Sequence, residues 1–184
     1  MGFTTQFNKT VSSCFYTQEI SKIKSFLPRE QLNIVITALV TSKLDYCNSL
    51  LYKIKNSEIE KLQSVQNVAI RLLFNRCKFD RLPLAPLYNE IHWLKVRKRI
   101  YFKICLIVHH CIWGAAPELL KRMMLITNPR TFKLKEKRCI GQYGERAISR
   151  SGPKLWNSLP LEVRMESEAD RFKRKLKTFL MKTN

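Results

Sequence analysis

Residues 96–113 read VRKRIYFKICLIVHHCIW, and this stretch decides the fold class of the chain. Its apolar residues recur at intervals of three and four positions, at Ile100, Ile104, Ile107, Val108 and Cys111. That spacing places them on one face of an α-helix. The sequence therefore predicts a long helix from Val96 to Trp113 with this face buried.

Helices are also expected upstream of this stretch. One should begin at Ser12 or Ser13 and end before Pro28, and another should cover residues 30–42. The second has an apolar face made of Leu32, Val35, Ile36, Leu39 and Val40. A third helix is expected after Ser57-x-x-Glu60, a capping-box pattern. Its inward positions are Ile59, Leu62, Val65, Ala69, Leu72 and Leu73, and its outward ones Lys61, Gln63 and Arg71.

Downstream, Gly114 is expected to end the long helix, and Pro117 to start a short one that runs to Met124. Residues 128–152 then lose helical periodicity, are basic and hold three of the five glycines, so we predict a linker or loop, with a short hairpin at most. One amphipathic helical turn should follow at residues 153–159.

The chain should end in a helix that Ser167-x-x-Asp170 caps, with an inward face of Phe172, Leu176, Phe179 and Leu180. Trp93 and Trp156 are expected as core anchors because of their size and apolar neighbours. The prediction is an all-α helical bundle in residues 1–127, a basic linker in 128–152 and a C-terminal helical extension in 153–184.

Basic residues strongly outnumber acidic ones. The 184 residues include 34 Lys and Arg against 14 Asp and Glu, a net charge of +20. The surplus is uneven, with 12 basic and 7 acidic residues in 1–94, but 22 and 7 in 95–184. Such a charge favours a polyanionic partner, nucleic acid in the first place, whose affinity should fall steeply with salt. A membrane surface and a merely solvated surface are the alternatives.

Three basic clusters are the candidate nucleic-acid-binding residues. The first follows the start of the long helix beside Tyr101 and Phe102, the second lies in the predicted linker, and the third lies on the last helix. A charged stripe with neighbouring aromatic rings can follow a phosphate backbone and stack on bases. The candidates are Lys95, Arg97, Lys98, Arg99, Lys103, Arg130, Lys133, Lys135, Lys137, Arg138, Arg171, Lys173, Arg174, Lys175 and Lys177.

No catalytic or metal site is expected. The six cysteines include no C-x-x-C pair, which indicates a reducing compartment and no disulfide framework. Cys105, His109 and Cys111 invite a zinc interpretation, but Cys111 falls on a different helix face from His109, so core residues are favoured. Asp45 and Asp80 are isolated, whereas two-metal catalysis needs carboxylates that converge on the ions.

Four short blocks then follow one another along the chain: Leu44–Tyr52, Leu62–Asn67, His92–Leu94 and Pro153–Pro160. Their order and spacing resemble the region after the palm in LINE-type (non-LTR, jockey-like) retrotransposon reverse transcriptases. The resemblance implies a polymerase thumb, a helical bundle that holds the template–primer duplex, with a C-terminal extension. Lys95 stands where the family usually has proline, a departure that leaves the implied fold unchanged.

In that family the catalytic aspartates lie on a palm upstream, and no Phe/Tyr-x-Asp-Asp motif occurs here. The resemblance therefore implies a segment that is inactive alone. The scattered cysteines and the lack of an apolar signal core at residues 1–9 predict an intracellular location, nuclear or cytoplasmic. The segment's expected partners are RNA, DNA or an RNA–DNA hybrid and the missing palm. It needs no cofactor itself, since Mg²⁺ serves the parent polymerase.

The alternative is a non-catalytic helical module for protein interaction or nucleic-acid binding, left over from a transposable element. No membrane partner is expected, because the longest apolar stretch, residues 100–112, is too short to cross a bilayer and contains Lys103.

Overall fold

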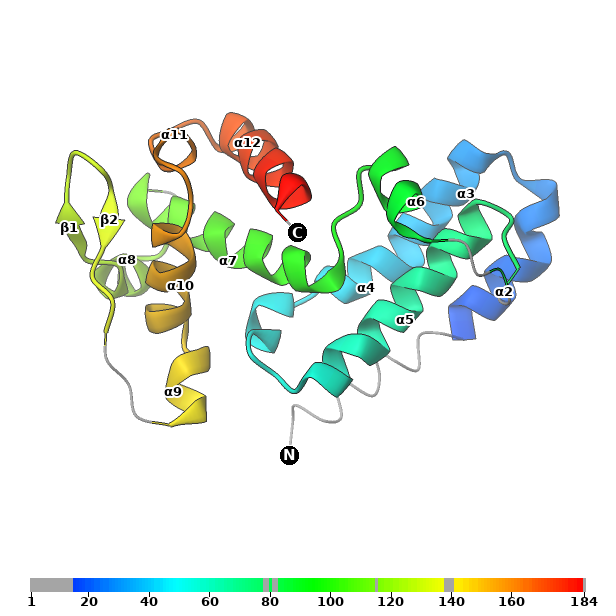
Figure 1. Ribbon diagram of the computed structural model, residues 1–184, viewed down its shortest axis with the longest axis horizontal. Coiled ribbons are helices and arrows are strands. Elements are labelled where there is room, and N and C mark those ends of the chain that lie inside the picture. The colour runs from blue at the N-terminus through cyan, green and yellow to red at the C-terminus, as the bar shows by residue number, and fades with distance from the viewer. Residues whose placement is uncertain (1–14, 78–79, 81–82, 115, 138–140, 184) are drawn as a thin grey trace. The chain divides into compact units, whose positions relative to one another are not determined.

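The computed structural model describes residues 15–77, 80, 83–114, 116–137 and 141–183. The described chain is mostly helical, with one small two-stranded sheet, which confirms the predicted all-α class (Figure 1). The expected helix start at Ser12 or Ser13 lies outside the described residues.

Contacts divide the chain into two compact units. The first comprises residues 1–47 and 54–97, and the second comprises residues 48–53 and 98–184. These boundaries differ from the predicted ones after residues 127 and 152. The predicted division assigned a thumb-like bundle to residues 1–127, a linker to 128–152 and a C-terminal extension to 153–184. The compact units do not test those assignments, so the division stays a prediction.

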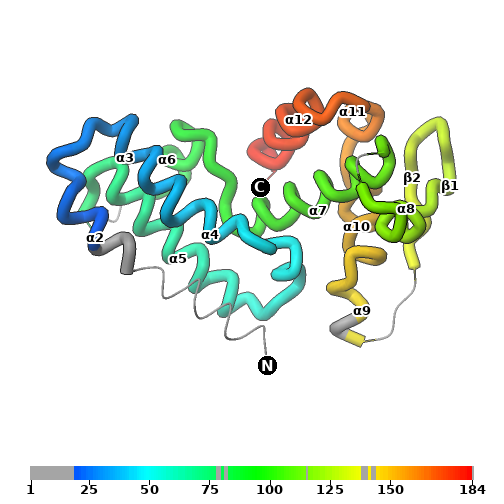
Figure 2. The backbone as a smooth tube through the Cα atoms, turned by 180° about the vertical axis from the view of Figure 1, so that it is seen from behind, coloured from blue at the N-terminus to red at the C-terminus, as the bar shows by residue number. Residues whose placement is uncertain are grey.

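The first unit consists of helical segments. They are α2 (Phe15–Ile23), the 3₁₀ turn η1 (Lys24–Phe26), α3 (Arg29–Ile36), the π-helical segment η2 (Thr37–Thr41), α4 (Ser42–Asp45), α5 (Asn56–Leu73) and α6 (Ala85–Glu90). Figure 2 shows α3, η2 and α4 as one continuous path that runs alongside α5.

The inner face of this continuous path has a period of four residues rather than 3.6. Its buried residues are Leu32, Ile36, Val40 and Leu44. In a regular α-helix, residues four apart drift around the axis, because a turn holds only about 3.6 residues. The wider π-helical turn of η2 offsets that drift and keeps the series on one face. It also turns Leu39, predicted to face inward, partly outward, with 36% of the residue exposed.

The start of α5 differs from the prediction. The helix begins at Asn56 after Lys55 in the N-cap position, and no side chain caps it, so the predicted capping box at Ser57 and Glu60 is wrong. Both residues lie inside the helix, because the chain enters the helical conformation earlier than the pattern indicates. The inward face is confirmed for Ile59, Leu62, Val65, Ala69 and Leu73, whereas Leu72 is half-buried.

Gln63 does not point to solvent as predicted, because it joins a polar network of the first unit. Its Oε1 accepts a hydrogen bond from the Val96 N–H at 3.0 Å, and its Nε2 donates to the Tyr88 hydroxyl at 2.5 Å. Gln66, fully buried, donates from Nε2 to the Leu94 carbonyl at 2.9 Å. The blocks Leu62–Asn67 and His92–Leu94 are therefore hydrogen-bonded to each other, which gives their polar side chains a role in folding.

Replacing Gln66 with leucine should lower the free energy of unfolding by about 1–3 kcal/mol, because the buried hydrogen bond from Gln66 Nε2 to the Leu94 carbonyl would be lost. Chemical denaturation would measure the change. The exposed Lys61→Gln variant on the same helix is the control and should stay within about 0.5 kcal/mol of the parent chain. An unchanged denaturation midpoint for Gln66→Leu would contradict a structural role for the amide.

The second unit combines helices with a hairpin. It contains η3 (Asn48–Leu51), most of α7 (Val96–Ile112), α8 (Glu118–Met123), β1 (Ile126–Asn128), β2 (Lys133–Leu134), α9 (Gln142–Arg146), α10 (Ile148–Asn157), α11 (Leu161–Arg164) and α12 (Ala169–Lys182). The long helix and the short helix after Pro117 are confirmed. So is the helix end at Gly114, which has a φ of +92°.

Residues 128–152 hold more regular structure than the predicted linker or loop. The short hairpin that the prediction allowed is present, whereas the helical segments that follow it were not expected. Strands β1 and β2 pair antiparallel, with Ile126 opposite Leu134, and α9 and half of α10 follow before Gly152. Gly152 is a packing residue, since an added Cβ would lie 2.9 Å from Val108 Cγ2 and 3.0 Å from Met124 Cε. Its presence therefore marks a close approach between elements and not a loop.

The last helix also starts differently from the prediction. Glu168 occupies the N-cap position of α12 in an extended conformation, and its side chain makes no capping hydrogen bond, so the predicted cap at Ser167 and Asp170 is wrong. The inward face is confirmed for Phe172, Leu176 and Leu180, which are buried, whereas Phe179 is half-buried.

Candidate nucleic-acid interface

An aromatic cluster forms the core of the second unit. Trp156 of α10 is fully buried, and its Nε1 donates to the Phe132 carbonyl in the hairpin turn at 2.8 Å. The Phe172 ring of α12 lies 5.6 Å from the Trp156 ring and stacks on His109 of α7 at 4.2 Å, measured between centroids. The expected anchoring role of Trp156 is confirmed, and it joins three helices and the hairpin.

Asn157 fixes the hairpin to α10. The Leu134 N–H donates to Asn157 Oδ1 at 2.9 Å, and Asn157 Nδ2 donates back to the Leu134 carbonyl at 2.9 Å. A carboxamide offers the same donor and acceptor as a peptide group, so this side chain takes the place of a neighbouring strand. The block Pro153–Pro160 thus positions the basic hairpin.

Helices α7 and α12 run antiparallel. His109 stacks on Phe172, and Lys98 donates a hydrogen bond to the Thr183 carbonyl. Lys98 and His109 are as far apart in the sequence as Phe172 and Thr183, so the two helices run side by side along most of α12. Figure 1 shows α12 lying alongside α7 in this way. The side of α12 away from Phe172 remains open to solvent and carries the basic residues.

Some of the predicted binding residues are already engaged within the chain. On α12, Arg171 pairs with Glu168 at 2.7 Å, Lys173 with Asp170 at 2.9 Å and Lys175 with Glu166 at 2.6 Å. Arg97 donates to Asn56 Oδ1 at 3.0 Å, and Arg99 is half-buried. The nearby carboxylates reduce the attraction of Arg171, Lys173 and Lys175 for an external anion.

The remaining predicted cations are exposed and form no ion pair within the described part of the chain. They are Lys95, Lys103, Arg130, Lys133, Lys135, Lys137, Arg174 and Lys177. Arg138 lies outside the described residues. Lys154 of α10 and Lys182 of α12 share these properties and were missed, because an isolated lysine carries no pattern in the sequence.

The exposed cations do not all share one face. Lys103 lies on a different side of α7 from Lys98 and His109, the residues that contact α12. Tyr101, expected beside the α7 stripe as a stacking residue, is half-buried, with its ring 5.9 Å from that of the buried Tyr52. The hairpin and the outer side of α12 are therefore the stronger candidates for contact with nucleic acid.

Cys105, His109 and Cys111 of α7 are core residues. Burial raises the pKa of Cys105 to about 12 and raises that of Cys111, so both remain thiols at neutral pH. His109 Nε2 bonds to the Glu166 carbonyl at 2.9 Å. Within the described residues, no group of three histidine, cysteine or acidic side chains is arranged to hold a metal ion.

The buried His109 makes stability depend on pH. Burial lowers the pKa of His109, and the charges of His110 and Lys173 act in the same direction, whereas the Glu166 carbonyl and carboxylate act against it. The unfolded chain, with a histidine pKa near 6.5, binds the proton more readily than the folded one. Stability is therefore fully present above about pH 6.5 and falls as the pH drops below it.

We expect this loss to have a slope of at most about 1.4 kcal/mol per pH unit. Denaturant unfolding between pH 5 and 8 would measure it. The His109→Phe variant keeps an aromatic ring against Phe172 and should show a flatter profile over that range. Identical profiles for the two chains would show that His109 contributes nothing to the pH dependence.

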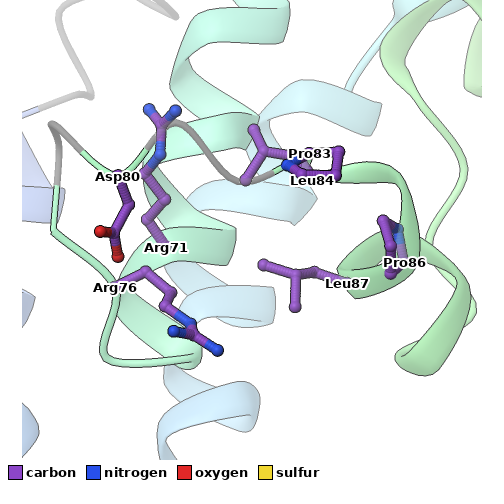
Figure 3. Close-up of a pocket in the computed structure, with 7 residues that line it drawn as sticks. All are labelled: Arg71, Arg76, Asp80, Pro83, Leu84, Pro86 and Leu87. Carbon is purple, nitrogen blue, oxygen red and sulfur yellow. The ribbon is translucent and has the colours of Figure 1, made fainter.

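The first unit has a pocket with a volume of about 200 Å³. Arg71, Arg76 and Asp80 line it together with apolar side chains that include Pro86 and Leu87 (Figure 3). The two guanidinium groups point in different directions, with Asp80 beside them. The pocket therefore lacks the converging donors that an anion site requires.

Comparison with protein-family models, with curated proteins and with solved structures found no match to this chain. Among the described residues, none of the helices combines the length and apolar character needed to cross a lipid bilayer.

Proposed function

We propose that this chain is the thumb and C-terminal segment of a LINE-type reverse transcriptase. In this proposal it binds template–primer nucleic acid through its basic second unit and is not catalytic alone. The ordered sequence blocks support the family, and a mostly helical fold is compatible with a polymerase thumb.

The charge of the second unit is the observation that carries the binding proposal. Its residues include 21 Lys and Arg against 7 Asp and Glu. Several of those acidic groups are used in local pairs, such as Glu145 with Lys53 and Glu118 with Arg122. Within the described residues, the exposed cations of the hairpin and Arg174, Lys177 and Lys182 of α12 form no ion pair, as expected for a surface that binds phosphates.

A protein-interaction module is the second candidate. Large apolar side chains are exposed on the first unit, with Phe26 82% exposed, Ile34 69% and Tyr46 67%. Exposed apolar groups of this size favour contact with another protein surface. In the reverse-transcriptase proposal, the missing palm is that partner.

Binding of the full chain to a fluorescent RNA–DNA hybrid across a salt series tests the proposal. The affinity should fall steeply as salt rises, because each phosphate contact contributes a slope of about −0.9 in log affinity against log salt on a duplex. Two further ligands serve as comparisons: a single strand of the same length, and a peptide nucleic acid, whose uncharged backbone offers no phosphate to bind. Absence of binding at low salt, or an affinity insensitive to salt, would refute the nucleic-acid proposal.

A primer-extension assay addresses catalysis separately. The chain alone should incorporate no nucleotide, because no Asp-Asp motif of the polymerase palm occurs in its sequence. Incorporation by the purified chain would overturn the non-catalytic assignment even if hybrid binding were observed.

A further inference from the structure

A buried arginine of the second unit has no carboxylate to neutralise it. Arg164, the last residue of α11, is only 6% exposed. Its Nε donates to the Leu159 carbonyl at 3.1 Å, and its Nη1 donates to the Thr131 carbonyl at 2.7 Å. Every acidic side chain of the sequence lies in the described part of the chain, and none forms an ion pair with Arg164.

The two carbonyls hold this guanidinium but do not balance its charge. Taking a cation out of water is costly unless an anion accompanies it. The third nitrogen, Nη2, makes no hydrogen bond within the described residues, so it remains a donor for a ligand oxygen. Arg164 is thus a fixed guanidinium that no anion compensates within the described chain.

The hairpin turn beside Arg164 adds further cationic and polar groups. Arg130 and Lys133 on either side of Thr131 are exposed, without an ion pair in the described chain. The Thr131 hydroxyl is buried and has no hydrogen-bond partner among the described residues. Because Trp156 also donates to the Phe132 carbonyl, side chains from α10 and α11 both hold this turn in place.

We propose that Arg164 and the hairpin turn form a phosphate-binding subsite that takes a backbone phosphate of a nucleic-acid strand. The inference rests on the proposed function and names the residue that anchors the strand. A planar guanidinium matches phosphate oxygens, and one that is already fixed loses little freedom on binding. Arg130 and Lys133 add attraction at longer range. Free inorganic phosphate carries the same oxygens and is the alternative ligand for this subsite.

The test uses NMR of the full chain, with the Arg164 Nε–Hε and Trp156 Nε1–H resonances as probes. Titration with an RNA–DNA hybrid should shift the Arg164 resonance with the same saturation curve as binding. Sodium phosphate at equal phosphate concentration should shift it much less. A shift that saturates with phosphate alone, and is absent with the hybrid, would overturn the assignment to a strand.

Variants separate this role from a purely structural one. Arg164→Lys keeps the positive charge but removes the planar guanidinium, so it should weaken hybrid binding by roughly tenfold while the salt slope stays near that of the parent chain. The matched control is Arg150→Lys, because Arg150 also donates to a backbone carbonyl, that of Lys137, but has Glu145 at 3.6 Å. Its affinity for the hybrid should match that of the parent chain.

The Trp156 resonance shows whether Arg164→Lys keeps the hairpin turn intact. If the turn is lost in that variant, two other measurements test the subsite: the titration of the parent chain and the exposed double variant Arg130→Gln/Lys133→Gln. The double variant should reduce the salt slope of hybrid binding by about two. Hybrid binding with no change of the Arg164 resonance, and an unchanged affinity in Arg164→Lys, would overturn the subsite alone. Failure of the parent chain to bind the hybrid at all would refute the proposed function as well.

Discussion

Replacing Trp156 with alanine should destabilise the second unit by about 3–5 kcal/mol, the range for a large buried aromatic side chain. The indole fills the space between α7, α12 and the hairpin turn, next to the Phe172 ring. Its loss would leave a cavity, and the Phe132 carbonyl would lose its donor. Chemical denaturation monitored by circular dichroism would measure the change in free energy.

Trp113 provides the matched control, since it is 37% exposed and its ring lies 5.0 Å from the Phe132 ring at the edge of the same cluster. Trp113→Ala should cost clearly less than Trp156→Ala. Trp156→Phe separates the two causes, because it keeps most of the buried area but removes the Nε1 donor. Equal losses for both alanine variants would contradict the central position of Trp156.

Removing four positive charges from the hairpin region should weaken hybrid binding by on the order of 100-fold or more at low salt. The variant changes Arg130, Lys133, Lys135 and Lys137 to glutamine. All four are exposed and form no ion pair within the described residues. The slope of log affinity against log salt should also decrease by about 3 to 4, as expected if each cation contacts one phosphate.

A second variant with the same net charge shows whether position matters. It changes Lys53, Arg122, Arg171 and Lys173 to glutamine, all of which pair with carboxylates in the second unit. Its affinity should fall much less, because those charges are already balanced locally. Equal losses in the two variants would show that only total charge governs binding and would remove the hairpin from the interface.

The faces of the long helices could be predicted because a helix with one side in the core repeats its apolar residues at a fixed period. Leu62, Ala69, Ile104, Val108 and Phe172 are buried as that period indicates. The helix starts were predicted less well, since Ser57 and Ser167 match capping patterns that the chain does not use. Neither pattern specifies where neighbouring elements force the helix to begin.

The basic residues of the candidate interface could be predicted from the sequence, but not which of them are free of internal ion pairs and can bind an external anion. The sequence predicted both Arg171 and Arg174 as binding residues. In the described chain Arg171 pairs with the Glu168 carboxylate, whereas Arg174 forms no ion pair. Arg164 carried no signal, because an isolated arginine before a polar segment resembles an ordinary surface residue. Its burial depends on the Leu159 and Thr131 carbonyls, and Thr131 belongs to a distant part of the sequence.

The sequence by itself determined the helical class, the inward faces of α5, α7 and α12 and the basic surplus of the second half, because periodicity and charge are local or additive properties. Only the tertiary structure decided that the glutamines of α5 are internal partners and that Gly152 is a packing contact. It alone decided which cations remain unpaired. These outcomes depend on groups far apart in the chain, whose proximity no local pattern encodes.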